Sequence, residues 1–220
     1  MIIDHGFARF MRSCKSLRLS TAVAAAVLAF VCCAPFSTAR VREYPVMASS
    51  ADDVRLRNKL IALSPTTVRE DEARRVAICA YTTGQEFRRK WRVVWPPGLQ
   101  VVLVNTGRKE GGLCYQWATV LLLRLNALKL QTLELHWAES FANTLSEHNV
   151  IVVTAKGQPF IQGILLDNWR CGGHLLYGLA AADPEYKWRE NTGEAARRLK
   201  AGWTSVGEKG HVRQAAKERE

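Results

Sequence analysis

The sequence lacks several features that would assign it quickly to a protein class. It shows no internal repeat, and its one zinc-like spacing, Cys171-Gly172-Gly173-His174, has no second pair of ligands at a matching spacing. Structural zinc needs four ligands, so chance or a disulfide role for Cys171 is the better interpretation. A zinc-binding structural domain that adds His136 or Cys79 is kept as an alternative.

Long apolar runs are scarce, and the most informative one lies near the N-terminus. Basic residues precede the run from Ala22 to Phe36, and small residues at 37–39 follow it, which is typical of an export signal cleaved after Ala39. The run falls short of the roughly 20 residues of a spanning helix, but an uncleaved inner-membrane anchor is an alternative. A lipoprotein attached through Cys32 or Cys33 is another, although the Val or Cys before each is a poor match. We expect an exported protein, periplasmic or anchored in the inner membrane.

Acidic residues are few beside basic ones. The chain has 31 Lys and Arg against 20 Asp and Glu, and without residues 1–39 the balance is 27 against 19, a net charge of +8. This charge allows peripheral contact with an anionic membrane surface, and a solvated basic surface explains it equally well. Trp203 is the only aromatic residue of the basic tail, and export argues against nucleic acid as a partner.

Cysteine is also scarce beyond residue 39, where only Cys79, Cys114 and Cys171 occur. In an oxidising compartment an odd number leaves at least one thiol unpaired unless it bridges to another chain. If Cys79 pairs with Cys171, Cys114 is the thiol left over. The sequence does not establish that pairing.

The first half of the remaining chain predicts helices. A short helix is expected near residues 52–63, and a longer one from Thr66 and Thr67, which would cap it, to about residue 90. Prolines in the stretch 95–98 mark a stop and a turn, and residues 101–104 fit a short strand or an extended loop. A second long helix, residues 114–129, is apolar nearly all round and is expected to be central and buried.

The second half predicts strands. Residues 132–138 alternate in polarity, residues 149–155 are rich in β-branched side chains, and residues 160–166 follow after a loop that contains Gly157. Helices followed by antiparallel strands are typical of an α+β domain. Beyond residue 188 the chain turns polar, with one loosely docked helix expected at 193–201.

Three short motifs carry the chemistry: GLCYQWA (112–118), EHNVIVV (147–153) and LLDNWR (165–170). Cys114 would begin the buried helix, where unsatisfied backbone amides and the helix dipole stabilise a thiolate. Glycines 111 and 112 would leave room for a substrate to approach. Cys114 alone fits a buried structural thiol as well as a nucleophile.

A cysteine nucleophile needs a base, and the base needs an acceptor that orients it. A hairpin centred between Gly157 and Gln158 would place His148 directly opposite Asp167 on one face of the sheet. Cys114 would then attack a carbonyl carbon, His148 would move the proton, and Asp167 would hold the imidazole. His136 is the weaker alternative base, because no acid lies opposite it in the predicted strands.

The oxyanion formed by that attack needs hydrogen-bond donors. The backbone N–H of Cys114 is one candidate, and Asn105 or Gln116 is the candidate second donor. Trp169, two residues after Asp167, is expected to shield the site from water.

In these motifs the sequence resembles the bacterial transglutaminase-like cysteine proteinases of the papain-like superfamily. The resemblance covers about residues 70–170 and implies a buried helix that starts at the nucleophile and packs on a small antiparallel sheet. It assigns Cys114 as nucleophile, His148 as base and Asp167 as acid, and it implies no cofactor. Family members often carry an acidic residue soon after the cysteine, whereas Tyr115-Gln116-Trp117 follows here.

The sequence divides into four parts, and the resemblance covers only the third of them. They are a signal peptide or membrane anchor (1–39), a linker with a short helix (40–65), a transglutaminase-like catalytic domain (66–188) and a polar, partly disordered tail (189–220). The expected function is cysteine-dependent acyl transfer on a protein or peptide, by hydrolysis or transamidation. An inactive envelope module that binds a peptide or partner protein in the same cleft is the alternative, and the oligomeric state is left open.

Overall fold

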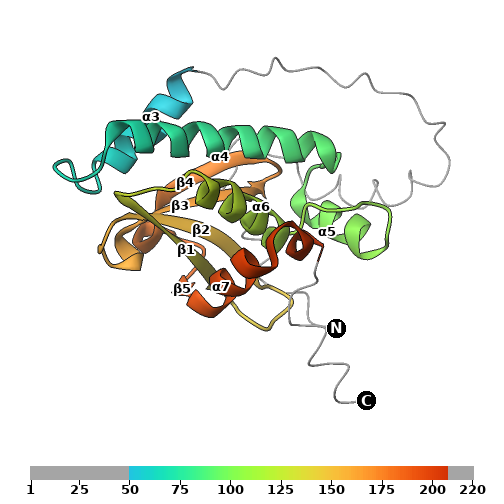
Figure 1. Ribbon diagram of the computed structural model, residues 1–220. Helices are drawn as coiled ribbons and strands as arrows, with labels where there is room; N and C mark the ends of the chain where they lie inside the picture. The colour runs from blue at the N-terminus through green and yellow to red at the C-terminus, as the bar shows by residue number, and fades with distance from the viewer. Residues whose placement is uncertain (1–49, 208–220) are drawn as a thin grey trace. The chain divides into compact units, whose positions relative to one another are not determined.

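The computed structural model describes residues 50–207. In this part of the chain five α-helices accompany a five-stranded antiparallel sheet, which confirms the α+β class (Figure 1). The predicted signal and residues 208–220 of the predicted tail lie outside the described residues. The helices are α3 (Ser50–Ile61), α4 (Glu70–Lys90), α5 (Pro97–Asn105), α6 (Cys114–Ala127) and α7 (Thr192–Ala201); the strands are β1 (Leu133–Ser140), β2 (His148–Ala155), β3 (Ile164–Cys171), β4 (His174–Leu179) and β5 (Arg189–Glu190).

The sheet has the order β4-β3-β2-β1-β5, so β2 lies at its centre and is buried along its whole length. Successive side chains of a strand point to opposite faces. Ile151, Val153 and Ala155 pack with the helices, whereas Val150 and Val152 pack on the other face with residues that include Ala180 and Trp188. Both faces of β2 therefore belong to a hydrophobic core.

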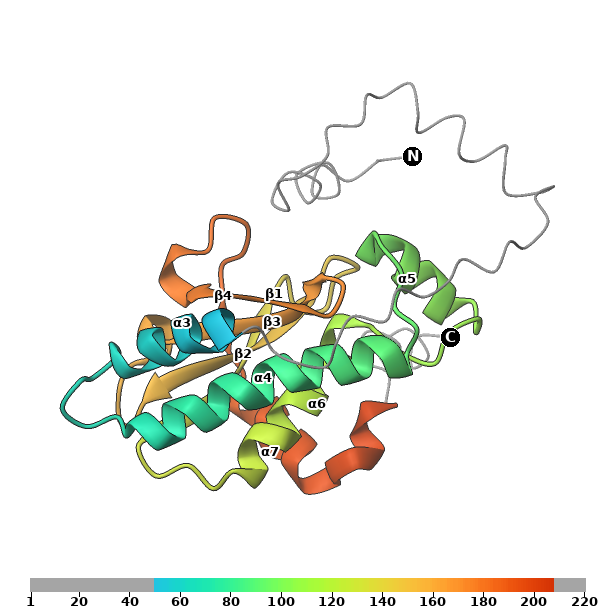
Figure 2. The same ribbon diagram turned by 90° about the horizontal axis from the view of Figure 1, so that it is seen from above.

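Helices α4 and α6 lie beside each other over one face of the sheet (Figures 1 and 2). The predicted second helix is confirmed: α6 begins at Cys114, and Leu121, Leu122 and Leu125 in its middle are almost fully buried. Within residues 50–207 we find no helix whose length and apolar character would suffice to cross a bilayer. The apolar surface of α6 serves the domain core.

Two predictions in the helical half of the chain were wrong: one about where a helix starts and one about the structure of residues 101–104. Helix α4 begins at Glu70 with Arg69 at its N-cap and no side-chain cap, while the Thr67 hydroxyl bonds to Ser64 instead. Residues 101–104, predicted as a strand or loop, belong to α5. A proline suits the first helical position, because its missing N–H has no intrahelical partner there, and Pro97 starts α5 in this way.

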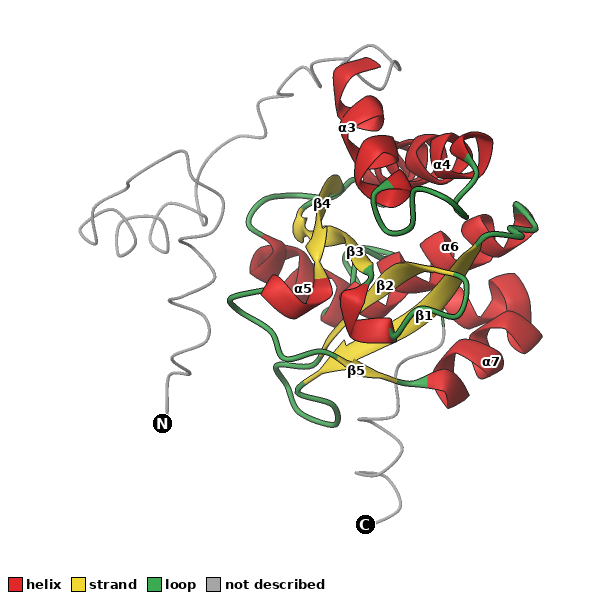
Figure 3. Ribbon diagram, turned by 90° about the vertical axis from the view of Figure 1, so that its left-hand side faces the viewer, coloured by secondary structure: helices red, strands yellow, loops and turns green. Residues whose placement is uncertain are grey.

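The strand predictions were close in place but incomplete. Strands β1 and β2 match the first two segments, whereas the third strand begins four residues late, because Phe160–Gln162 form a 3₁₀ turn before Ile164. Strands β4 and β5, which border the sheet, were not predicted. Figure 3 shows β5 at the edge next to β1, leading into α7.

The helix expected at 193–201 is α7, and a buried arginine anchors it. The Arg198 side chain is 1% exposed and donates to Thr119 of α6 and to the Ser205 carbonyl, while its Nε binds Glu194. Its guanidinium also lies over the Tyr115 ring at 5.2 Å. These contacts tie residues of the predicted tail to the helix that begins at Cys114.

Gly84 is the residue that lets α4 approach the turn between β3 and β4. A Cβ atom at this position would lie 2.3 Å from the Asn168 side-chain nitrogen and 2.5 Å from the Gly173 carbonyl oxygen. Glycine is unfavourable inside a helix, so its presence here is explained by this close approach. The contact matters for the site because Asn168 directly follows Asp167.

We predict that Gly84→Ala destabilises the protein by about 1–3 kcal/mol, because overpacking outweighs the better helix propensity of alanine. Chemical denaturation checks this prediction. Gly178→Ala is the matched control, since a Cβ there meets no atom within 4 Å, and it should leave stability unchanged or slightly higher. A Gly84→Ala variant as stable as Gly178→Ala would show that α4 does not need the close contact.

Candidate active site

Cys114 is the first residue of α6, with Leu113 at the N-cap. The first N–H groups of a helix have no intrahelical acceptor, so they leave a local positive potential at the thiol. Gly111 and Gly112 precede it, but neighbouring side chains fill the space beside them. A Cβ at Gly111 would lie 2.5 Å from Trp91 Nε1, and one at Gly112 would lie 2.9 Å from Gln100 Nε2. The glycines therefore admit Trp91 and Gln100, not a substrate.

Gln100 fixes the loop in front of Cys114. Its buried side chain donates to the Gly111 carbonyl at 2.6 Å and accepts from the Val94 N–H at 3.0 Å. Gly112 has φ +110, a conformation that suits glycine. The loop thus enters α6 along one path and holds Cys114 in place.

Cys114 is partly exposed, and its sulfur contacts two residues at the start of β2. The thiol donates to the Glu147 carbonyl at 3.5 Å, and the Asn149 side-chain N–H donates to the sulfur at 3.8 Å. His148 lies between these two residues in the sequence. The predicted nucleophile and the predicted base are therefore brought together, because α6 begins where β2 begins.

His148 and Asp167 form a buried pair. His148 Nε2 lies 2.7 Å from Asp167 Oδ2, and the residues are 1% and 2% exposed. The other ring nitrogen, Nδ1, is buried and has no hydrogen-bond partner among the described residues. Burial by itself lowers the pKa of His148, but the Asp167 carboxylate outweighs it, and with a smaller contribution from Cys114 the pKa rises to about 9. An imidazolium at neutral pH follows.

Asp167 accepts more hydrogen bonds than the one from His148. Its Oδ1 accepts from the backbone N–H groups of Trp169 and Arg170, at 2.7 and 3.1 Å, and its Oδ2 accepts from Arg170 Nε at 2.7 Å. Burial raises the pKa of Asp167, but His148 and Arg170 outweigh burial and hold the pKa well below its usual range. The carboxylate therefore stays ionised and keeps the imidazole in one orientation.

Arg170 extends the pair into a buried charge network. Its two terminal nitrogens bind the two oxygens of Asp183 at 3.2 and 2.6 Å, and Asp183 also accepts from Trp188 Nε1 at 3.1 Å. Burial opposes ionisation of Asp183, but Arg170 lowers its pKa. The network connects β3 to the segment 183–188.

Aromatic rings enclose the His148 imidazole. The ring centres of Trp169, Tyr186 and Trp188 lie 4.8, 4.7 and 5.5 Å from that of His148. Trp169 comes from β3, whereas Tyr186 and Trp188 come from the segment that Asp183 anchors. These rings keep water from the His148–Asp167 pair, and Trp169 lies where the sequence suggested such a shield.

The predicted register of β2 and β3 was wrong by two residues. Ile151 pairs with Leu166 and Val153 with Ile164, so a strictly continued register would set His148 opposite Trp169 and not Asp167. The loop of residues 156–163 contains the 3₁₀ turn in place of a tight hairpin. A shift of two residues preserves the face, so His148 and Asp167 still meet, diagonally.

The candidate oxyanion donors lie elsewhere or are occupied. Asn105 is exposed at the end of α5 and has no side-chain hydrogen bond to Cys114, His148 or Asp167. Gln116 is buried and turned back, since its Oε1 accepts from the Leu113 N–H at 3.0 Å and its Nε2 donates to the Glu110 carbonyl at 3.5 Å. Gln116 therefore closes the first turn of α6.

His136, the alternative base, has partners of its own. Its ring nitrogens bind Glu190 at 2.6 Å and Thr154 at 2.8 Å. The predicted strands offered no acid opposite His136, and the acid that binds it comes from β5, an unpredicted strand that brings Glu190 beside β1. With both nitrogens occupied, His136 has none left for Cys114.

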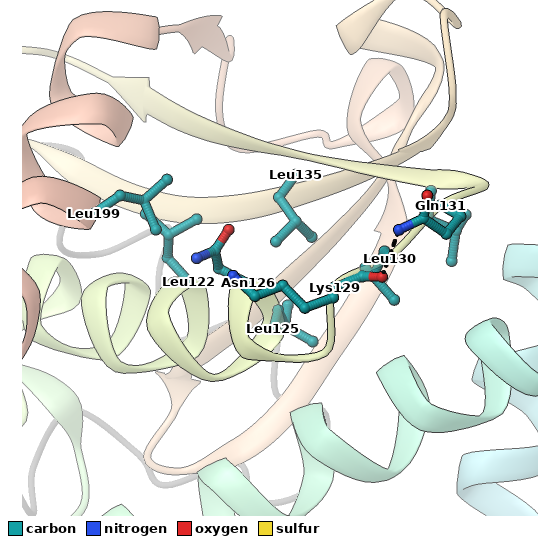
Figure 4. Close-up of a pocket in the computed structure, with 9 residues that line it drawn as sticks. Leu122, Leu125, Asn126, Lys129, Leu130, Gln131, Leu135 and Leu199 are labelled. Atoms are coloured by element: carbon teal, nitrogen blue, oxygen red, sulfur yellow. Dashed lines mark hydrogen bonds between the residues drawn. The ribbon is translucent and has the colours of Figure 1, made fainter.

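A cavity of about 310 Å³ lies at the far end of α6, and Figure 4 shows the leucine and polar side chains that line it. Leu122, Leu125 and Asn126 of α6, Leu135 of β1 and Leu199 of α7 contribute to it. This end of the helix is roughly 15 Å from Cys114 by helical rise. None of the three predicted catalytic residues lines it.

The alternative zinc site finds no ligand set in residues 50–207. No three His, Cys, Asp or Glu side chains of this part of the chain gather as a metal ion would require. No disulfide joins Cys79, Cys114 and Cys171 to one another. His174 of the Cys-x-x-His motif instead lies in β4, near Arg88, and burial lowers its pKa.

The comparisons with known proteins give no family assignment. The chain matches no protein-family model, and no curated protein or solved structure is significantly similar to it.

Sequence reasoning missed Asn149, Arg170 and Asp183. Asn149 follows His148 directly, and Arg170 follows Asp167 by three residues, so both stood within the quoted motifs. A buried acid is expected to have a basic partner, and that expectation would have pointed to Arg170. Nothing local connects Asp183 to the site, because its role depends on how residues 183–188 fold back.

The His148–Asp167 pair predicts a pH dependence of stability. Since the pKa of His148 is raised from about 6.5 to about 9, its contribution is complete below pH 6.5 and is lost as the pH rises through 9. The loss should be on the order of 3 kcal/mol. In urea denaturation between pH 6.5 and 9, His148→Gln should lack this decline. Parallel declines in both proteins would contradict the assignment.

We predict that Arg170→Met destabilises the protein by about 3–5 kcal/mol, because it leaves Asp183 buried without its cation and Asp167 with His148 alone. The free energy of unfolding checks this. Arg55→Met is the control, since its pair with Asp52 is exposed and 3.8 Å long, and it should change stability by less than about 1 kcal/mol. If the two substitutions change the free energy of unfolding equally, Arg170 does not stabilise the site.

Proposed function

We propose that this protein is an exported cysteine-dependent acyl-transfer enzyme that acts on a protein or peptide. The observation that carries the proposal is the orientation of His148. Its Nε2 binds Asp167, so the buried Nδ1 is the ring nitrogen left for the Cys114 thiol, whose interaction with His148 helps to raise the pKa of the imidazole. A buried polar nitrogen costs free energy unless a partner binds it, and a thiolate at the helix terminus is such a partner.

In the proposed reaction the Cys114 thiol loses its proton and His148 carries one on Nδ1, so that a thiolate faces an imidazolium. The sulfur attacks the carbonyl carbon of the substrate, the C–S bond forms, and an oxyanion develops. His148 then gives its Nδ1 proton to the leaving amine as the C–N bond breaks, and a thioester remains. Water, deprotonated by His148, or a second amine then releases the acyl group.

The resemblance to the transglutaminase-like cysteine proteinases supports the same proposal, with α6 as the helix behind the nucleophile and β2 and β3 as the strands that carry base and acid. Hydrolysis and transamidation use the same three residues. An inactive module that binds a peptide or partner protein is the alternative, and it predicts an ordinary thiol at Cys114. Export and peripheral contact with an anionic membrane belong to the proposal as well.

Alkylation of the purified, reduced protein by iodoacetamide at pH 6 tests the proposal. A thiolate is required for this reaction, so Cys114 should be modified quickly, and His148→Ala should slow its modification by about tenfold or more. Mass spectrometry of peptides gives the rate at each cysteine. A rate at Cys114 that His148→Ala leaves unchanged would favour the inactive module.

Cys79 supplies the internal control. It lies in α4 beside Thr83, and burial raises the pKa of its thiol. Its alkylation should be slow in both proteins, and His148→Ala should not affect it. If Cys79 becomes reactive in the variant, the substitution has loosened the fold and the comparison must be repeated with His148→Gln.

A further inference from the structure

Asn149 presents a fixed N–H group at the sulfur of Cys114. Its Oδ1 accepts from Trp137 Nε1 at 3.0 Å, and an indole nitrogen can only donate, so Nδ2 must be the end that faces the thiol. Nδ2 also donates to Glu147 Oε1 at 3.0 Å, which uses one of its two hydrogens. The second hydrogen is left for the sulfur, 3.8 Å away.

The burial of this amide makes its orientation durable. Asn149 is 3% exposed and Trp137 is 1% exposed, and Trp137 is part of the core beneath the helices. Turning the amide over would set its NH₂ group against the indole N–H, which would leave a buried donor unsatisfied. The donor is therefore aimed at the thiol before any substrate binds.

We propose that the Asn149 side chain and the Cys114 backbone N–H together bind the oxyanion of the acyl-transfer step. This inference rests on the proposed function and assigns the donor for which Asn105 and Gln116 were the sequence-based candidates. When sulfur bonds to the carbonyl carbon, the oxyanion lies within about 3 Å of that sulfur. A donor 3.8 Å from the sulfur can reach that position at ordinary hydrogen-bond length.

The contact has one role before the attack and another after it. Before the attack the weak N–H···S contact orients the sulfur. As the oxyanion forms, the negative charge leaves the sulfur for the oxygen, and the same N–H gains a stronger acceptor. Asn149 therefore binds the transition state better than the ground state, which is the condition for a catalytic contribution.

Two reactions of the Cys114 thiol distinguish oxyanion binding by Asn149 from an effect of Asn149 on the thiol or on the fold. Alkylation by iodoacetamide is a displacement that forms no oxyanion, whereas acylation by p-nitrophenyl acetate passes through one. The thiolate forms a C–S bond to the acetyl carbon, p-nitrophenolate leaves, and water then releases acetate. Asn149→Ala should slow acylation by about 10²–10³-fold and change the alkylation rate at pH 6 by less than about threefold.

Asn58→Ala is the matched control, since Asn58 is exposed in α3, and it should change neither rate. Trp137→Phe removes the bond that orients the amide, so it should slow acylation less than Asn149→Ala does. Thermal unfolding shows that each variant is folded at the assay temperature. If Asn149→Ala fails to fold, Trp137→Phe tests the proposal instead: it should slow acylation more than it slows alkylation.

The outcomes distinguish the two proposals. If Asn149→Ala slows both reactions equally, Asn149 acts on the thiolate or on the fold, and the oxyanion role is overturned. If it slows neither, the role is overturned as well, while the proposed function stands. If p-nitrophenyl acetate does not acylate Cys114 in the unsubstituted protein and His148→Ala leaves alkylation unchanged, the proposed function itself fails.

Discussion

The hydrogen bond between His148 and Asp167 is the interaction on which the rest of the structure depends. Both groups are buried, so each needs an opposite charge nearby to stay ionised. Arg170 also binds Asp167, and Asp183 balances the charge of Arg170. The aromatic segment from Asp183 to Trp188 is thereby held over the imidazole. One ion pair in the sheet thus accounts for the packing of a distant segment.

The sequence predicted those parts of the fold that follow from local pattern. Each of three local patterns favours one kind of secondary structure. They are the apolar face of α4, the continuous apolar surface of α6 and the alternation of β1. Residues 101–104 did not, because a short β-branched run suits a strand as well as a helix, and the prolines before it decided in favour of α5. The edge strands β4 and β5 depend on partners far away in the chain, which no local pattern contains.

The sequence pattern could predict which face of the sheet carries the candidate site, but not the register of the strands. A period of two fixes which face a strand residue occupies, so His148 and Asp167 could be assigned to one face without the exact register. The 3₁₀ turn in the connection moved the register by two residues and left the faces unchanged. A shift of one residue would have separated the pair. The contacts of Arg170 with Asp183 and of Asn149 with Trp137 required the tertiary structure.

The central strand also explains how several groups converge on one sulfur. His148 contacts Trp188 on the face of β2 away from the helices, whereas Asn149 contacts Trp137 on the face toward them. Since α6 begins where β2 begins, the Cys114 sulfur lies at the end of the strand, within reach of both faces. Two consecutive residues can then place an imidazole and a neutral amide donor near the sulfur from opposite sides. Each is held by a separate core, so a change in one core should reach the sulfur through one of the two groups only.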